Sequence, residues 1–125
     1  MRQIREVGGI SAELPQRLHT WFAEHEECLQ SCGITGDVQR SPEDGRTKIS
    51  SWMTLETDDR VAVLTVWSSG EAELECGDVA TSQVRRQHRD LRSFEELLDA
   101  IETTCEWIQT KGGQFPDGRP DQLSC

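Results

Sequence analysis

The sequence predicts a two-layer α+β fold in which an N-terminal helix and a C-terminal helix cover one face of an antiparallel meander of four to five strands. Two observations carry this prediction. Apolar residues recur at helical spacing near both ends of the chain, and they alternate with polar residues in the middle. An antiparallel sheet of this kind buries one face under its helices and can leave the other open to solvent.

The first helix is expected over residues 12–32. Its apolar positions recur at steps of three and four and comprise Leu14, Leu18, Trp21, Phe22, Leu29 and Cys32. We expect Pro15 in the first turn, where a missing N–H matters least. Gly33 is expected directly after the helix end, where glycine adopts the left-handed conformation at little cost.

Residues 34–88 show the alternation of strands. We expect strands at 34–39, 48–57, 60–67 and 71–79, a loop at 41–46, and a candidate fifth strand at 84–88. The second helix begins with a capping box, Ser93 and Glu96, and continues with a stripe of Phe94, Leu97, Leu98, Ile101, Cys105 and Ile108. Gly112 and Gly113 are expected to end it. The predicted organisation is an N-terminal lead at 1–11, one α+β domain at 12–110, and a flexible C-terminal tail at 111–125.

Two turns fix which side chains share a face. A two-residue turn at Asp58–Asp59 pairs Trp52 with Thr65. Ser68–Gly70 suits a three-residue loop, a type I turn closed by a left-handed glycine, which places Leu74 opposite Leu64. A two-residue turn there would instead bury two glutamates among leucines, at a high desolvation cost.

The predicted register separates an apolar face from a polar one. The helices should cover Met53, Leu55, Leu64, Val66, Leu74 and Cys76. The opposite face carries Val63 and a candidate partner-binding site made of Trp52, Thr54, Thr65, Trp67, Glu71, Glu73 and Glu75. Tryptophans are frequent anchors of protein interfaces, and carboxylates suit a basic partner. The alternative is that the two tryptophans pack under the 41–46 loop or the C-terminal tail.

The charge balance favours a positively charged partner over nucleic acid. The 125 residues include 23 acidic and 13 basic side chains, for a net charge of −10. Acidity that serves only solubility is the alternative interpretation. The chain has no apolar run of membrane-spanning length, and MRQIREVGG does not resemble a secretory signal, so a cytoplasmic location without membrane contact is expected.

Five cysteines without a repeating spacing are expected to be reduced thiols, mostly small core residues, with the terminal one exposed; they are Cys28, Cys32, Cys76, Cys105 and Cys125. His25 opens a pattern like HExxH, but Leu29 occupies the second histidine position. A zinc site made of His25, Cys28 and Cys32 would need Cys105 as a fourth ligand, and core packing explains these residues more simply. We therefore predict no metal, no cofactor and no catalytic residues.

A basic cluster at the last strand comprises Arg85, Arg86, His88 and Arg89. It could bind an anion, but a charged edge strand that discourages sheet-to-sheet association is the simpler interpretation.

The stretches RVAVLTVWSSGEAELE (60–75) and QHRDLRSFEELLDAIETTCEWI (87–108) resemble the TriTu family of bacterial immunity proteins. The resemblance spans residues 14–108. It implies a cytoplasmic antidote, encoded beside a polymorphic toxin, that inhibits by stoichiometric binding without turnover. The acidic charge suggests a positively charged toxin domain, such as a nuclease or a nucleic-acid-modifying enzyme. Two alternatives remain: a secretion chaperone that holds its client unfolded, and a small enzyme using His25 with Cys28 or Cys105.

Overall fold

The computed structural model describes residues 6–41 and 49–109. Its elements, in chain order, are α1 (Glu6–Ser31), β1 (Thr35–Arg40), β2 (Ser50–Glu56), β3 (Arg60–Trp67), β4 (Glu71–Asp78), β5 (Val84–Asp90) and α2 (Phe94–Gln109). The five strands form one antiparallel sheet in the order β1-β2-β3-β4-β5. The predicted α+β class and the helix–meander–helix order are confirmed.

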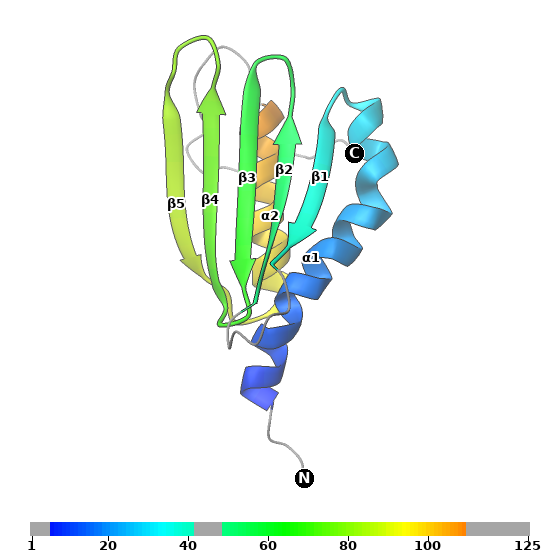
Figure 1. The fold of residues 1–125 in the computed structure, drawn as a ribbon, viewed down its shortest axis with the longest axis vertical. Helices are drawn as coiled ribbons and strands as arrows, with labels where there is room; N and C mark the ends of the chain where they lie inside the picture. Colours follow the sequence, from blue (N-terminus) through cyan, green and yellow to red (C-terminus); the bar gives the residue numbers. More distant parts are fainter. Residues whose placement is uncertain (1–5, 42–48, 110–125) are drawn as a thin grey trace.

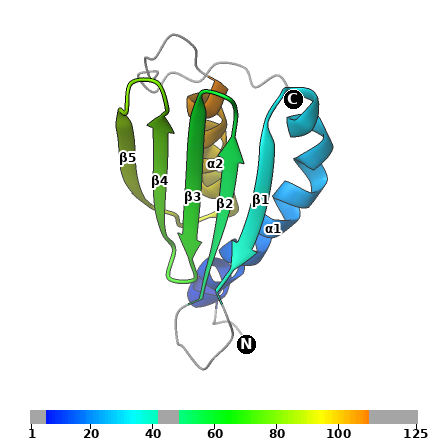
Figure 2. The same cartoon turned by 45° about the horizontal axis from the view of Figure 1, so that its top comes forward.

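Both helices lie on the same side of the sheet (Figures 1 and 2). α1 packs against β1, β2 and β3, while α2 packs against β2, β3 and β4 and also touches α1. None of the described elements crosses the other side of the sheet (Figure 1). The two-layer arrangement therefore leaves one face of the sheet without a covering helix. No helix in the described ranges is both long and apolar enough to span a membrane.

α1 differs from the prediction at its start and agrees with it at its end. The helix begins at Glu6, so Pro15 lies well inside it rather than in the first turn, and the predicted position of Pro15 is wrong. An interior proline removes one helical hydrogen bond, and here the buried position of Pro15 offsets part of that loss. At the other end, the N–H groups of Gly33 and Ile34 donate to the carbonyls of Gln30 and Leu29, both at 3.0 Å. Gly33 has a φ of 83°, as its predicted role requires.

The hydrophobic core forms between the helices and the predicted apolar face. The six residues assigned to that face are at most 1% exposed. Trp107 of α2 is 1% exposed and was missed by the helical stripe, whereas Phe94, which was included in it, is 36% exposed. The guanidinium of Arg17 lies over the Phe94 ring at 4.5 Å, so this ring packs between the helices at the surface instead of in the core.

The cysteines follow the prediction only in part. Cys76 and Cys105 are buried free thiols and Cys28 is a half-buried one. Cys32 is exposed and disulfide-bonded, so the expectation of a reduced core thiol is wrong at this position. Helical spacing placed Cys32 on the apolar stripe, but α1 ends at Ser31 and the chain turns there. Cys125, the predicted helix end at 112–113 and the tail at 111–125 lie outside the described residues.

A buried ion pair joins the sheet to the end of α2. Arg60, at the start of β3, is 1% exposed and donates from Nε to the Asp78 carboxylate at 3.2 Å. Its Nη1 donates to the carbonyl of Trp107 at 2.8 Å. Because the last carbonyls of a helix have no partner within it, this contact supplies one that the helix cannot provide for itself.

A candidate partner-binding face

The β2–β3 hairpin sets the position of the first tryptophan. The N–H of Thr57 donates to the carbonyl of Arg60 at 2.9 Å, which closes the predicted two-residue turn. Trp52 pairs with Thr65, and Thr54 pairs with Val63. The predicted register of this hairpin is confirmed.

The β3–β4 hairpin sets the position of the glutamates. The N–H of Gly70 donates to the carbonyl of Trp67 at 2.9 Å, and Gly70 has a φ of 98°. This is the predicted three-residue loop, in which glycine supplies a conformation that other residues adopt at a cost. Leu64 pairs with Leu74, and Thr65 pairs with Glu73. The carboxylates therefore share a face with the tryptophans.

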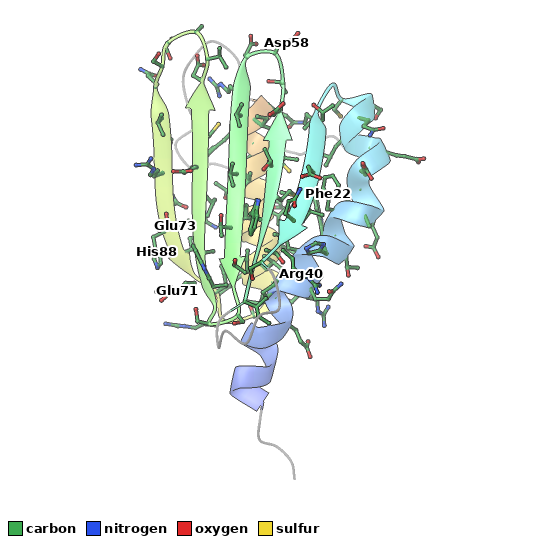
Figure 3. All side chains as sticks on the ribbon, in the orientation of Figure 1. Phe22, Arg40, Asp58, Glu71, Glu73 and His88 are labelled. Atoms are coloured by element: carbon green, nitrogen blue, oxygen red, sulfur yellow. The ribbon has the colours of Figure 1, made fainter. Side chains whose placement is uncertain are left out.

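This open face is shielded only by its own side chains in the described part of the chain. All seven residues of the predicted site are half-buried, while their inward-facing neighbours are at most 1% exposed. Figure 3 shows Glu71 and Glu73 on the β4 side of the sheet. The alternative that the tryptophans pack under the 41–46 loop or the C-terminal tail concerns residues that lie largely outside the described ones. The role of the seven residues in binding stays a prediction.

The outer strands contribute residues that the sequence-based site did not include. Gln39 of β1 pairs with Trp52, and β5 places Arg86 opposite Glu75 and His88 opposite Glu73. The open face thus spans all five strands. Arg86 and His88 are two residues apart, so the sequence indicates that they share one face of a strand. The turn between β4 and β5 gave no basis for predicting the register of these two strands, and hence which face that is.

The glutamate row is partly neutralised by β5. Arg86 Nε lies 2.6 Å from the Glu75 carboxylate, and His88 Nδ1 lies 3.1 Å from that of Glu73. His88 Nε2 lies 3.3 Å from the carboxylate of Asp90. The hydrogen bond to Glu73, followed by that to Asp90, raises the pKa of His88 above its ordinary value. The face therefore carries mixed charge along β4 and β5.

The basic cluster of β5 is divided between the two faces of the sheet. Arg86 and His88 belong to the open face, whereas Arg85 lies 5.5 Å from the Trp107 ring centre on the helix side. Arg89 contacts Asp99 at 3.4 Å and Thr103 at 3.0 Å, both on α2. Alternation along the strand thus separates side chains that are adjacent in sequence, and they do not form one anion site.

Two of the described thiols, Cys76 and Cys105, are poorly suited to nucleophilic chemistry. Burial raises the pKa of Cys76 to about 11 and that of Cys105 to about 12, which keeps both protonated near neutral pH. The ring of His25 stacks on Trp21 at 4.2 Å between centroids. Within residues 6–41 and 49–109 no three histidine, cysteine or acidic side chains are grouped to hold a metal ion. The open face instead offers aromatic rings, hydroxyls and carboxylates for contact with another molecule.

Comparison with known protein families gives a match to the family described as Immunity protein TriTu, over residues 16–108. The chain belongs to this family. The matched segment runs from within α1 into the last turn of α2 and so contains the whole sheet and the open face. The predicted family resemblance is confirmed, and an immunity function with a cognate toxin as partner follows from it. A comparison with curated proteins gives no match.

Proposed function

We propose that this TriTu immunity protein neutralises its cognate toxin by stoichiometric binding through the open face. The observation that carries the proposal is the register of the two central hairpins, which gathers two tryptophans and three glutamates on a face without a covering helix. Aromatic residues at the centre of a contact patch, bordered by polar ones, are typical of protein interfaces. Family membership supplies the toxin as the partner.

Each part of the face has a distinct role in the proposed complex. Trp52 and Trp67 are the anchors. Thr65 lies opposite Trp52 and next to Trp67 on the same face, and Thr54 lies on the other side of Trp52. Truncation of a buried interface anchor typically costs about 2 kcal/mol or more. The carboxylates of Glu71, Glu73 and Glu75 attract the partner during encounter. Exposed ion pairs such as Glu75–Arg86 are worth about 0–1 kcal/mol, so these glutamates can exchange partners when the toxin binds.

The charge of the chain supports a cationic toxin. A net charge of −10 accelerates encounter with a positively charged protein and disfavours acidic partners. A cationic cleft is a property of nucleases and nucleic-acid-modifying enzymes, since their substrates carry a regular array of phosphates. The proposed partner is therefore a basic toxin domain of this kind, neutralised in the cytoplasm.

Titration of toxin activity with purified immunity protein tests the proposal. Activity should fall linearly and vanish at a fixed stoichiometric ratio, and the association rate should decrease as salt is added. The toxin in the complex should keep its near-ultraviolet circular dichroism, because it is bound in its folded state. Full protection at substoichiometric amounts would indicate turnover, and an unfolded toxin in the complex would indicate a chaperone; either result contradicts the proposal.

A further inference from the structure

A groove runs along the outer edge of β1, where α1 borders it. It is lined by one side of α1, including His19, Ala23 and Glu26, and by three consecutive β1 residues, Gly36 to Val38. Figure 1 shows α1 running beside β1 at this edge, and Figure 3 shows Phe22 between the two elements. Because consecutive residues of a strand point to opposite faces, a groove lined by three of them in a row follows the strand's edge.

The backbone of β1 directs hydrogen-bonding groups into this groove. Two backbone hydrogen bonds show which residues of β2 bond to β1 and which bond to β3. They run from the N–H of Thr57 to the carbonyl of Arg60 and from the N–H of Ser41 to the carbonyl of Ser50. By the alternation of an antiparallel ladder, Gly36, Val38 and Arg40 direct their N–H and C=O groups away from β2. No described strand pairs with β1 on that side. Such an edge is a template for an added strand.

The opposite edge of the sheet is less suited to strand addition. The corresponding outward positions of β5 include Arg86 and His88, whose side chains are engaged with glutamates of β4. Charged residues on an edge strand discourage pairing. The groove beside β5 is lined in the described structure by Gln83 to Gln87 alone, so it lacks a second wall of the kind that α1 provides at β1.

The side chains around the β1 groove favour a basic occupant. Glu24, Glu26 and Asp37 are exposed on its walls, and its described lining residues include no lysine or arginine. The one described cation beside it is Arg40, which donates to Gln16 at the end of the groove. The apolar part of the lining comprises the half-buried Val38 and the buried Phe22. Nε2 of His19, on the α1 wall, is buried and has no hydrogen-bond partner in the described structure. A strand that alternates basic and small apolar residues would match both kinds of contact.

We propose that an extended basic segment of the toxin adds to the outer edge of β1 as a sixth strand, in the groove that α1 borders. This inference rests on the proposed function, because it assigns the toxin as the source of the strand. Main-chain hydrogen bonds to β1 would supply affinity, and the acidic walls would select the segment. The added strand would lie next to β1, with Gln39 between it and Trp52, and so extend the open face at its β1 side.

Amide hydrogen exchange, measured by NMR on the full chain alone and with its cognate toxin, tests the inference. The outward amides of Gly36, Val38 and Arg40 should exchange at least about tenfold more slowly in the complex. The amides of Asp37 and Gln39 already face β2 and should change less. A complex that leaves the three outward amides unprotected overturns this inference but not the proposed function, whereas failure to form any complex overturns both.

Proline substitution supplies a matched pair of variants. Val38→Pro removes an outward N–H on β1, and Val84→Pro removes one on β5, a change that edge strands tolerate. With both variants shown to be folded by thermal melting, only Val38→Pro should weaken toxin binding, by about tenfold or more. Equal binding by the two variants contradicts the inference. If Val38→Pro fails to fold, the double variant Glu24→Lys/Glu26→Lys replaces it. Glu102→Lys, on the exposed side of α2, is then the control. Unchanged affinity of the double variant for the toxin would again contradict the inference.

Discussion

Arg60 is the charged residue on which the described core depends most. Its guanidinium connects β3, β4 and α2 through the contacts to Asp78 and to the carbonyl of Trp107. Asp78 also accepts the N–H of Thr81 at 3.0 Å, and these donors, with the Thr81 N–H foremost, lower the pKa of its carboxyl. A carboxyl with a lowered pKa stabilises the fold above its unfolded-state pKa, and this contribution is lost as the pH falls through the folded-state value.

Replacement of Arg60 should therefore be costly, even though a buried ion pair is not by itself evidence of net stabilisation. Arg60→Met leaves a buried carboxylate and a helix-end carbonyl without their donor, and we expect a loss of about 3 kcal/mol in the free energy of unfolding. Arg86→Met, which breaks an exposed pair with Glu75, is the control and should cost less than about 1 kcal/mol. Urea unfolding measures both, and similar losses for the two variants would show that burial does not decide the effect.

His88 provides a residue-scale test of the charge arrangement on the open face. Because Glu73 is the main cause of its raised pKa, Glu73→Gln should move the pKa of His88 back toward the ordinary histidine value. Asp90→Asn should lower it by a smaller amount. The interactions stabilise the folded state below the unfolded-state pKa of histidine, and this contribution fades as the pH rises through the folded-state value. NMR titration of the His88 ring measures the shift, and an unchanged pKa in the Glu73 variant would contradict the paired geometry.

At the scale of elements, the approach of α1 to β1 depends on a glycine. A Cβ added at Gly36 would lie 2.7 Å from Phe22 Cε1 and 2.9 Å from Leu55 Cδ2, both closer than van der Waals contact permits. Gly36→Ala should therefore force α1 and β1 apart and destabilise the fold by about 1–3 kcal/mol. Gly77 of β4 has no heavy atom within 4 Å of an added Cβ, so Gly77→Ala should stay within about 0.5 kcal/mol of the parent. Thermal unfolding measures the stability of both alanine variants. Equal stabilities would contradict the close contact between Gly36 and Phe22.

The helix order and the two central hairpins were predictable because local chemistry determines them. Gly70 and Asp58–Asp59 fix turn lengths, and an error of one residue would have exchanged the two faces of a strand. One half of the predicted capping box forms, because Glu96 N–H donates to Ser93 Oγ at 3.1 Å. The Glu96 carboxylate reaches one residue beyond the N-cap and accepts from the N–H of Arg92 at 2.6 Å instead of from that of Ser93.

Features set by tertiary contacts were not predictable from local patterns. The interior position of Pro15 depends on packing that a rule for isolated helices does not include. Trp107 is buried against the sheet, where Arg60 donates to its carbonyl. Phe94 lies at the surface, where Arg17 of α1 covers its ring. On the candidate site, the central strands were predicted correctly, but the contribution of β5 required the long-range pairing of Glu73 with His88.

At the scale of the whole molecule, the two faces of the sheet differ because both helices lie on the same side of it. The covered face holds the core, and the open face is free to present tryptophans, threonines and glutamates that the fold does not require to be there (Figure 2). A binding face on a rigid sheet is pre-organised, which reduces the entropy lost on association. If the toxin binds as proposed, substitutions on the open face should alter binding without a large effect on the stability of the fold.

The most direct test of this account is the affinity of Trp52→Ala and Trp67→Ala variants for the purified cognate toxin, measured by isothermal titration calorimetry. Each truncation should weaken the complex by about 2 kcal/mol or more, or roughly 30-fold in Kd, while the melting temperature changes little. Glu102→Lys, on the exposed side of α2, should bind nearly as tightly as the parent protein. Parent-like affinity in both tryptophan variants would contradict the claim that the open face is the toxin-binding surface.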